Sequence, residues 1–334
     1  ISNIQKYIKS NIGDKNFVNN DLISLGFWPG GDRDGNPYVT PEITLKTAEK
    51  LKFSILRNYF REIRKMKRSL TFDGLEEKLD ILESELYSTL FSKNKPTYFN
   101  LVYFENAIDE IHNIIKKQSD GLYESLILDL KHKVKIFGFH FASLDIRQDS
   151  RIHKQVFDEI FSHPEIQNYV KNLPENFSKL DSAERRQVLS KIKGDVPPDI
   201  FKSKITRETL GSIRAMSKIQ ELNGERGCNR YIISNCQTID NLIELFALHK
   251  ICNWDKPTVD IIPLFETIPD LSVCKKIMEN LYNNDEYRKH LSTRGDKQTV
   301  MLGFSDGTKD GGYFMANWSI YKAKEDLTEL SNKF

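Results

Sequence analysis

Through the first two thirds of the chain, apolar residues recur every three or four positions, which is the spacing of amphipathic helices. The clearest example begins with Thr40 as a favourable N-cap, Pro41 in the first helical position and Glu42 at the positive end of the helix dipole. This helix is predicted to run to about Lys67. Further helices are predicted over residues 74–91, 102–117, 120–134, 151–172, 182–193 and 206–223, with polar loops at 93–97 and 194–198.

After residue 224, short apolar runs alternate with amphipathic stretches. The runs 230–234, 259–265 and 299–304 predict strands, and each precedes a predicted helix. These helices are capped by Thr238, begun at Pro269 and begun near Gly312. An earlier run, 137–146, has alternating apolar positions and is a candidate fourth strand. Strand–helix repeats indicate parallel strands covered by helices, so we expect a mainly α chain with a partial α/β barrel, or alternatively a doubly wound sheet.

Charged residues leave three of these runs at the end where parallel α/β folds gather their reactive groups. The run 259–265 is followed by Glu266, the run 299–304 by Asp306, and the run 137–146 by Arg147. Two carboxylates on separate strands suit a hard divalent cation such as Mg²⁺, and an arginine beside them suits a phosphate or carboxylate. The alternative is that both acidic residues only cap the following helices.

Other candidate chemistry is weaker. The stretch 303–312 is rich in glycine, and its backbone N–H groups and Lys309 suit an anion, although a simple turn is the alternative. A calcium loop starting at Asp32 fails because Pro37 and Ile43 stand where glycine and glutamate are needed. Among the histidines, His140 lies in an apolar run and is predicted as a core residue.

Composition narrows the class of protein. The chain has 334 residues with 49 Lys and Arg against 47 Asp and Glu, so a general polycation for nucleic acid or anionic lipid is excluded. No apolar run reaches the roughly 20 residues of a membrane helix. The four cysteines have no zinc-site spacing and indicate reduced thiols in the cytosol. We expect a largely helical part over residues 1–134 and the partial barrel with helical insertions over 135–334.

Four separate motifs resemble phosphoenolpyruvate carboxylase in their order and spacing. They are FWPGGDRDGNP (27–37), LDIRQ (144–148), PLFET (263–267) and VMLGFSDGTKDGG (300–312). The last is similar to one of the family's two signatures and departs from it at Phe304, where the family usually has tyrosine, and at Gly307, where it usually has serine.

The resemblance implies an enzyme that carboxylates phosphoenolpyruvate with bicarbonate to oxaloacetate and phosphate, using Mg²⁺ or Mn²⁺. Such enzymes fix carbon to supply the tricarboxylic acid cycle. They are mostly helical cytosolic homotetramers around an eight-stranded barrel. By position, the resemblance makes Glu266 and Asp306 metal ligands, Arg147 a ligand of substrate phosphate and Lys309 a lysine beside the site. Arg33, in the first motif, becomes a candidate substrate-binding residue.

The family's Thr-Ala-His-Pro-Thr signature and its Arg/Gly-rich loop do not occur in this sequence. The first residues, Ile1–Lys6, lack methionine and a signal peptide. We therefore expect a central fragment of the enzyme that has no carboxylase activity alone. Two alternatives remain open at this point: another phosphoenolpyruvate or pyruvate barrel enzyme, such as a dikinase or lyase relative, and a helical interaction scaffold without catalysis.

Overall fold

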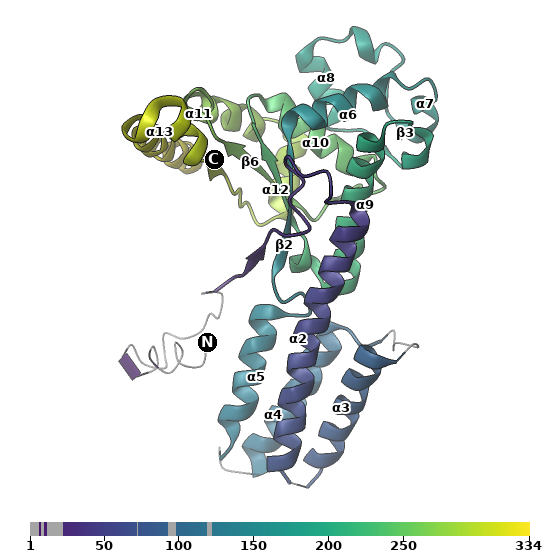
Figure 1. Ribbon diagram of the computed structural model, residues 1–334, viewed down its shortest axis with the longest axis vertical. Coiled ribbons are helices and arrows are strands. Elements are labelled where there is room, and N and C mark those ends of the chain that lie inside the picture. Colours follow the sequence, from purple (N-terminus) through teal and green to yellow (C-terminus); the bar gives the residue numbers. More distant parts are fainter. Residues whose placement is uncertain (1–6, 8–9, 12–22, 72, 93–97, 119–121) are drawn as a thin grey trace. The chain divides into compact units, whose positions relative to one another are not determined.

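The computed structural model describes residues 7, 10–11, 23–71, 73–92, 98–118 and 122–334 (Figure 1). The expectations for residues 1–6 and for the loop 93–97 therefore lie outside the described residues. The described chain divides into two compact units. The first comprises the described parts of 1–27, 46–143 and 219–227, and the second comprises 28–45, 144–218 and 228–334.

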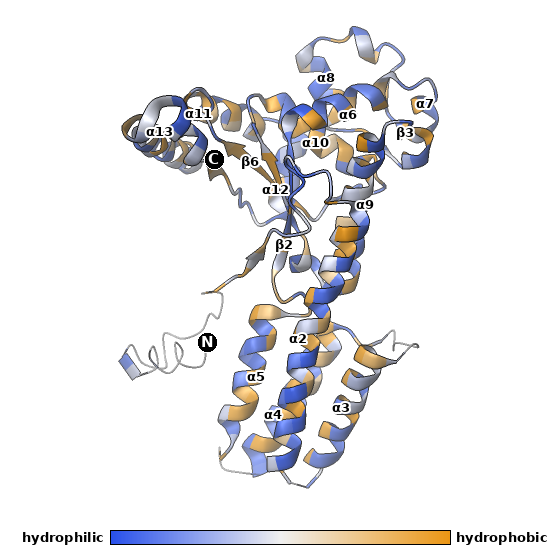
Figure 2. Cartoon of the chain, in the orientation of Figure 1, coloured by the Kyte–Doolittle hydropathy of each residue, from blue (hydrophilic) through white to orange (hydrophobic). Residues whose placement is uncertain are grey.

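The first unit is built on helices whose apolar faces meet in one core. Its strand β1 has two residues, and its helices follow the predicted amphipathic pattern; the elements are β1 (Gly26–Phe27), α2 (Pro41–Ser69, in this unit from residue 46), α3 (Leu75–Phe91), α4 (Leu101–Gln118) and α5 (Glu124–Phe137). In Figure 2 the apolar stripes of these helices alternate with hydrophilic ones. The predicted helices 74–91, 102–117 and 120–134 are confirmed where the chain is described.

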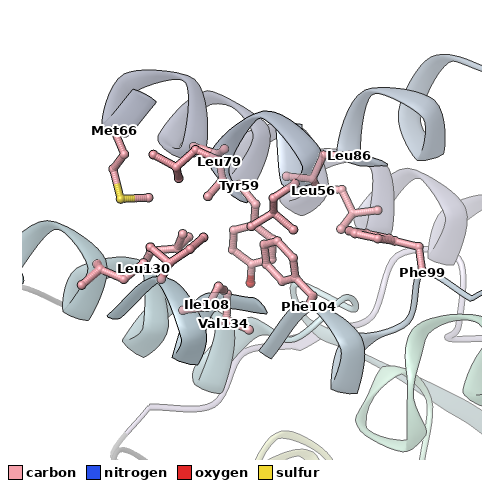
Figure 3. Close-up of a cluster of buried hydrophobic side chains, with 14 of the residues drawn as sticks. Leu56, Tyr59, Met66, Leu79, Leu86, Phe99, Phe104, Ile108, Leu130 and Val134 are labelled. Carbon is pink, nitrogen blue, oxygen red and sulfur yellow. The ribbon is translucent and has the colours of Figure 1, made fainter. Parts of the chain in front are cut away.

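Tyr59 lies at the centre of this core (Figure 3). Its ring stacks on Phe104 with 5.4 Å between centroids, and its hydroxyl donates to the backbone oxygen of Gly138 at 2.9 Å. Leucine and isoleucine side chains from α3, α4 and α5 surround the pair. The buried hydroxyl therefore has an acceptor, which removes the main cost of placing tyrosine in an apolar core.

The second unit contains a parallel sheet with strand order β2-β5-β6-β7, and this sheet is curled. Its strands are β2 (Ser143–Asp149), β5 (Arg230–Ser234), β6 (Asp260–Phe265) and β7 (Met301–Leu302). All three neighbouring pairs are parallel, with Asp145 opposite Arg230, Arg230 opposite Asp260 and Leu264 opposite Met301. The expected parallel sheet is confirmed. Because the carboxyl ends of parallel strands meet at one edge, residues after β5 and β6 come together there.

Helices and short turns connect these strands. They are α6 (Ser150–Ser162), α7 (Ile166–Tyr169), η2 (Phe177–Lys179), α8 (Ser182–Leu189), η3 (Pro198–Ile200), α9 (Lys204–Asn223), η4 (Glu225–Gly227), α10 (Ile239–Lys250), α11 (Ile268–Tyr282), α12 (Asp285–Thr293) and α13 (Ser305–Lys333), with a separate two-stranded pair β3 (Val170–Lys171) and β4 (Lys193–Gly194). Helices α10 and α11 pack against β6. Helices α11 and α13 pack against each other (Figure 1).

Two predicted elements before residue 180 are wrong in their extent. The strand expected over 137–146 begins only at Ser143, because Gly138 ends α5 with a positive φ of 46° and Phe141 has φ 65°. Arg147 therefore lies inside β2 instead of following it. The helix expected over 151–172 ends at Ser162, since Pro164 keeps His163 in an extended conformation.

The last predicted strand and helix are also wrong in their extent. Only Met301 and Leu302 of the run 299–304 form a strand, and the helix begins at Ser305 instead of near Gly312. Gly312 is a kink inside that helix, with φ 79° and ψ 171°. The glycine-rich stretch is therefore the first two turns of α13, and Asp306 and Lys309 lie on a helix.

In the part of the chain that the structure describes, no helix has the length and apolar character needed to cross a membrane.

Candidate active site

Glu266 lies where the sheet's central strands end. It follows β6 directly and is half-buried, and one of its oxygens accepts the backbone N–H of Asn235 at 2.9 Å. Burial raises the pKa of Glu266; the Asn235 N–H and Arg147 oppose this, whereas the carboxylates of Asp306 and Asp34 add to it. The surroundings of Glu266 thus disfavour the ionised form of its carboxyl.

Asp306 comes to the same edge from the first turn of α13. Lys309, one helical turn further on, donates to its Oδ1 at 2.7 Å, and the side chains of Asp306 and Lys309 are 47% and 79% exposed. This ion pair is open to solvent, so it is weak and leaves Asp306 available to another cation.

The capping alternative does not account for either carboxylate. The N-cap of α11 is Thr267, whose hydroxyl accepts from the N–H of Asp270, and the N-cap of α13 is Phe304. Glu266 precedes the cap, and Asp306 follows it. Both acidic side chains are therefore free of the role that most often explains an acidic residue at the start of a helix.

Arg147 projects from β2 and is held by the loop that precedes α2. Its Nε and Nη2 donate to the two oxygens of Asp32 at 2.8 and 2.9 Å, and its Cζ lies 4.9 Å from the ring centroid of Trp28. The carboxylate of Asp34 lies 3.8 Å from Nη2. Arg147 is thus placed near Glu266 with part of its guanidinium already occupied.

Arg33 has different surroundings from Arg147. Only 3% of its side chain is exposed, its Nε donates to the Val39 oxygen at 3.3 Å, and its Nη1 donates to the Glu208 oxygen at 3.2 Å. Its guanidinium also lies 3.6 Å from the Glu208 carboxylate. The contacts with Glu208 anchor the loop that carries Arg33 to α9. A substrate-binding role for Arg33 stays a prediction.

The sequence analysis missed the residues at the end of β5. Ser234 donates its hydroxyl to Asp34 at 2.8 Å, and the N–H of Asn235, a residue with φ 51°, binds Glu266. Ser234 ends the apolar run 230–234 and Asn235 follows it, so the rule that singled out Glu266 and Asp306 could have found them. Their uncharged side chains gave no chemical signal of their own.

Gly303, in the connection between β7 and α13, is required to be glycine because it lies close to Glu266. A Cβ atom on Gly303 would lie 3.1 Å from the Cα and 3.2 Å from the Cγ of Glu266. Those distances are shorter than ordinary van der Waals contact, so a larger residue would push the β7–α13 connection away from Glu266.

The donor set fits a hard divalent cation. Glu266 and Asp306 supply carboxylate oxygens, and the charge of Asp306 adds to the effect of burial in raising the pKa of Glu266. Among the described residues, no group of three or more His, Cys, Asp or Glu side chains could hold a metal alone. A cation here would take its other ligands from water and substrate, which is usual for Mg²⁺.

Comparison with known proteins decides the family. The sequence model of phosphoenolpyruvate carboxylase matches residues 1–90 and 75–334, which together span the whole chain. The chain belongs to the phosphoenolpyruvate carboxylase family. It is 34% identical to the phosphoenolpyruvate carboxylase of Nitrosomonas eutropha over 93% of this chain, and 30% identical to that of Rhodothermus marinus over 91%. The chain spans 38% of the length of each of these phosphoenolpyruvate carboxylases.

Family membership confirms the resemblance and excludes the alternative of a dikinase or lyase relative. All four motifs of the phosphoenolpyruvate carboxylase resemblance lie in the second unit apart from Phe27. Each of them contributes side chains just described: Trp28 and Asp32 from the first, Arg147 from the second, Glu266 from the third, and Asp306 and Lys309 from the fourth.

Replacing Glu266 by glutamine should leave the stability of the metal-free protein at pH 7 unchanged or raise it. The folded state raises the pKa of this carboxyl, so the ionised form costs free energy that glutamine does not. A carboxyl whose pKa is raised in the folded state contributes most to stability below the pKa that it has in the unfolded chain, and less as the pH rises. The difference in stability between Glu266→Gln and wild type should therefore shrink from pH 7 to pH 5.

Urea midpoints with EDTA present measure this effect. Glu286 is the matched control, because its hydrogen bond from Lys289 lowers the pKa of that carboxyl and Glu286→Gln should lower stability slightly. A large loss of stability in Glu266→Gln would mean instead that Glu266 has a structural ion pair or hydrogen bond.

Proposed function

We propose that this chain supplies the metal-binding and phosphate-binding edge of a phosphoenolpyruvate carboxylase, which converts phosphoenolpyruvate and bicarbonate to oxaloacetate and phosphate. The observation that carries the proposal is the placement of the three side chains on neighbouring elements of one parallel sheet. Glu266 follows β6, Asp306 lies in the first turn of the helix after β7, and Arg147 lies near the end of β2. Family membership supports the reaction, and the share of the relatives' length makes the activity one of the longer protein.

In this proposal Glu266 and Asp306 would hold Mg²⁺ or Mn²⁺. When bound, the cation neutralises negative charge on the enolate oxygen of the substrate. The support is the chemistry of the donors: two carboxylates without a capping role, one of them half-buried with a raised pKa.

Arg147 would bind the phosphoryl oxygens, since a planar guanidinium recognises phosphate with two N–H groups. Lys309 is largely exposed and tethered to Asp306, and would add a positive charge for the same anion. Trp28, at 37% exposure, covers one face of Arg147 and limits water there. Excluding water matters because a proton delivered to the enolate would yield pyruvate.

The wider expectations belong to this proposal as well. They are a (β/α)-barrel of the TIM type completed by the rest of the enzyme, a cytosolic homotetramer, and a supply of oxaloacetate to the tricarboxylic acid cycle. The parallel, curled sheet supports the first of these. The boundary between residues 134 and 135 stays a prediction.

The purified 334-residue chain should form no oxaloacetate from phosphoenolpyruvate, bicarbonate and Mg²⁺. The sequence lacks the family signature whose histidine is associated with the breakdown of carboxyphosphate. A coupled assay with malate dehydrogenase and NADH measures the product, and added oxaloacetate is the positive control. Turnover above the blank would refute the proposal that the activity needs the longer protein. Loss of that turnover in Arg147→Gln would then place the complete site in this chain.

A further inference from the structure

The loop over residues 28–37 is joined to β2 by main-chain hydrogen bonds at Arg147. The N–H of Arg33 donates to the Arg147 oxygen at 2.9 Å, and the N–H of Arg147 donates to the Gly31 oxygen at 3.2 Å. Asp32 and Arg147 form a parallel bridge. A Cβ atom on Gly31 would lie 2.1 Å from the backbone oxygen of Asp145, so only glycine permits this approach. The backbone thus fixes Asp32 beside Arg147.

Asp32 occupies the Nε–Nη2 edge of the Arg147 guanidinium and leaves the Nη1 side open. The hydrogen bonds from Nε and Nη2 are parallel and use both carboxylate oxygens, at 2.8 and 2.9 Å. The ring of Trp28 covers one face of the same group. A guanidinium has five N–H bonds in one plane, and no described residue accepts from the two on Nη1.

Asp34 is near the same guanidinium without binding it. Its Oδ2 is 3.8 Å from Nη2 and accepts the hydroxyl of Ser234 at 2.8 Å. At 3.8 Å it contributes charge but makes no hydrogen bond. Asp32 and Asp34 therefore place the same charge close to Arg147 in two different geometries, which makes them a matched pair for experiment.

We infer that Asp32 is the positioning residue of Arg147: it holds the guanidinium by the Nε–Nη2 edge so that the Nη1 side is presented to a phosphate oxygen. This inference rests on the proposed function, in which Arg147 binds the substrate phosphate. A free arginine side chain samples many rotamers, and fixing it in advance removes that entropy cost from binding.

Phosphate affinity separates positioning from simple charge. Asp32→Asn and Asp34→Asn each remove one negative charge, so electrostatics alone predicts that both bind an anion more tightly. Positioning predicts that Asp32→Asn binds inorganic phosphate about tenfold more weakly, because a misplaced binding group loses most of its effect. Asp34→Asn should bind phosphate as tightly as wild type or more so. Titration followed by ³¹P NMR gives both affinities, and Asp32→Glu should recover part of the loss.

The ¹⁵N–¹H signal of the Arg147 Nε measures the positioning without any ligand. It should be sharp and slow to exchange in wild type and Asp34→Asn, and broad or absent in Asp32→Asn, while far-UV circular dichroism stays unchanged. An equally protected signal in Asp32→Asn, or tighter phosphate binding in that variant, overturns the inference. Equal phosphate affinity in wild type and Arg147→Gln contradicts the proposed function instead, and the Nε signal still decides the role of Asp32.

Discussion

Lowering the pH from 7 to 5 should cost this protein several kcal/mol of stability. Four histidines are buried, and burial lowers their pKa to about 4 for His140, His249 and His290 and about 3 for His153. The unfolded chain binds protons at these positions near pH 6.5 and the folded chain does not. Their contribution is therefore complete above pH 6.5 and lost as the pH falls towards 4.

The magnitude follows from the span of pH. Between pH 6.5 and pH 5 the stabilising contribution of each histidine falls by about 2 kcal/mol, at about 1.4 kcal/mol per pH unit. This is large beside a typical free energy of unfolding of about 5–15 kcal/mol. Acids whose pKa is raised act in the opposite direction. Burial raises the pKa of Glu244 to about 7 and also raises the pKa of Asp145, Glu105 and Glu266, so their protonation regains part of the loss. The four histidines, at about 2 kcal/mol each, leave a net destabilisation.

Urea midpoints at pH 7 and pH 5 measure the effect, and one substitution assigns it. In His249 the Nδ1–H donates to the Leu245 oxygen at 2.9 Å, and Nε2 is buried with no partner among the described residues. His249→Gln should reduce the pH dependence by about a quarter, since one of four similar groups is removed. His163→Gln, at a partly exposed position, is the matched histidine-to-glutamine control. Equal midpoints at pH 7 and pH 5 would contradict the burial of these rings.

The amphipathic helices could be predicted from sequence because each has an unbroken apolar stripe and clear end signals. The helix begun by Thr40 and Pro41 is an example, and so is the one capped by Thr238. The failures occurred where backbone geometry overrides hydropathy. The apolar run from Phe137 looked like a strand, yet the turn through Gly138 and Phe141 delays the strand to Ser143.

The sequence predicted those residues of the candidate site that are charged and follow a strand. Glu266 and Asp306 were singled out by this rule, and the charge of Asp306 adds to the effect of burial on the pKa of Glu266. The contacts that orient the site were not predictable in this way. The hydrogen bond from the Asn235 N–H uses main-chain atoms, and the pairing of Asp32 with Arg147 joins residues 115 positions apart. No local pattern encodes either contact.

The second large effect expected is the loss of Mn²⁺ binding when either Glu266 or Asp306 is replaced, because a cation shared by the two carboxylates depends on both. Removing a direct carboxylate ligand should weaken binding by at least about tenfold, the lower bound for residues that only support a ligand. Glu286→Gln removes the same charge from an ion pair with Lys289 and should leave Mn²⁺ affinity unchanged.

Water-proton relaxation during an Mn²⁺ titration of the full chain therefore tests the central claim most directly. We expect saturable binding in wild type and in Glu286→Gln, and its loss in both Glu266→Gln and Asp306→Asn. Binding that is unchanged in either of these two variants would contradict a cation site shared by Glu266 and Asp306.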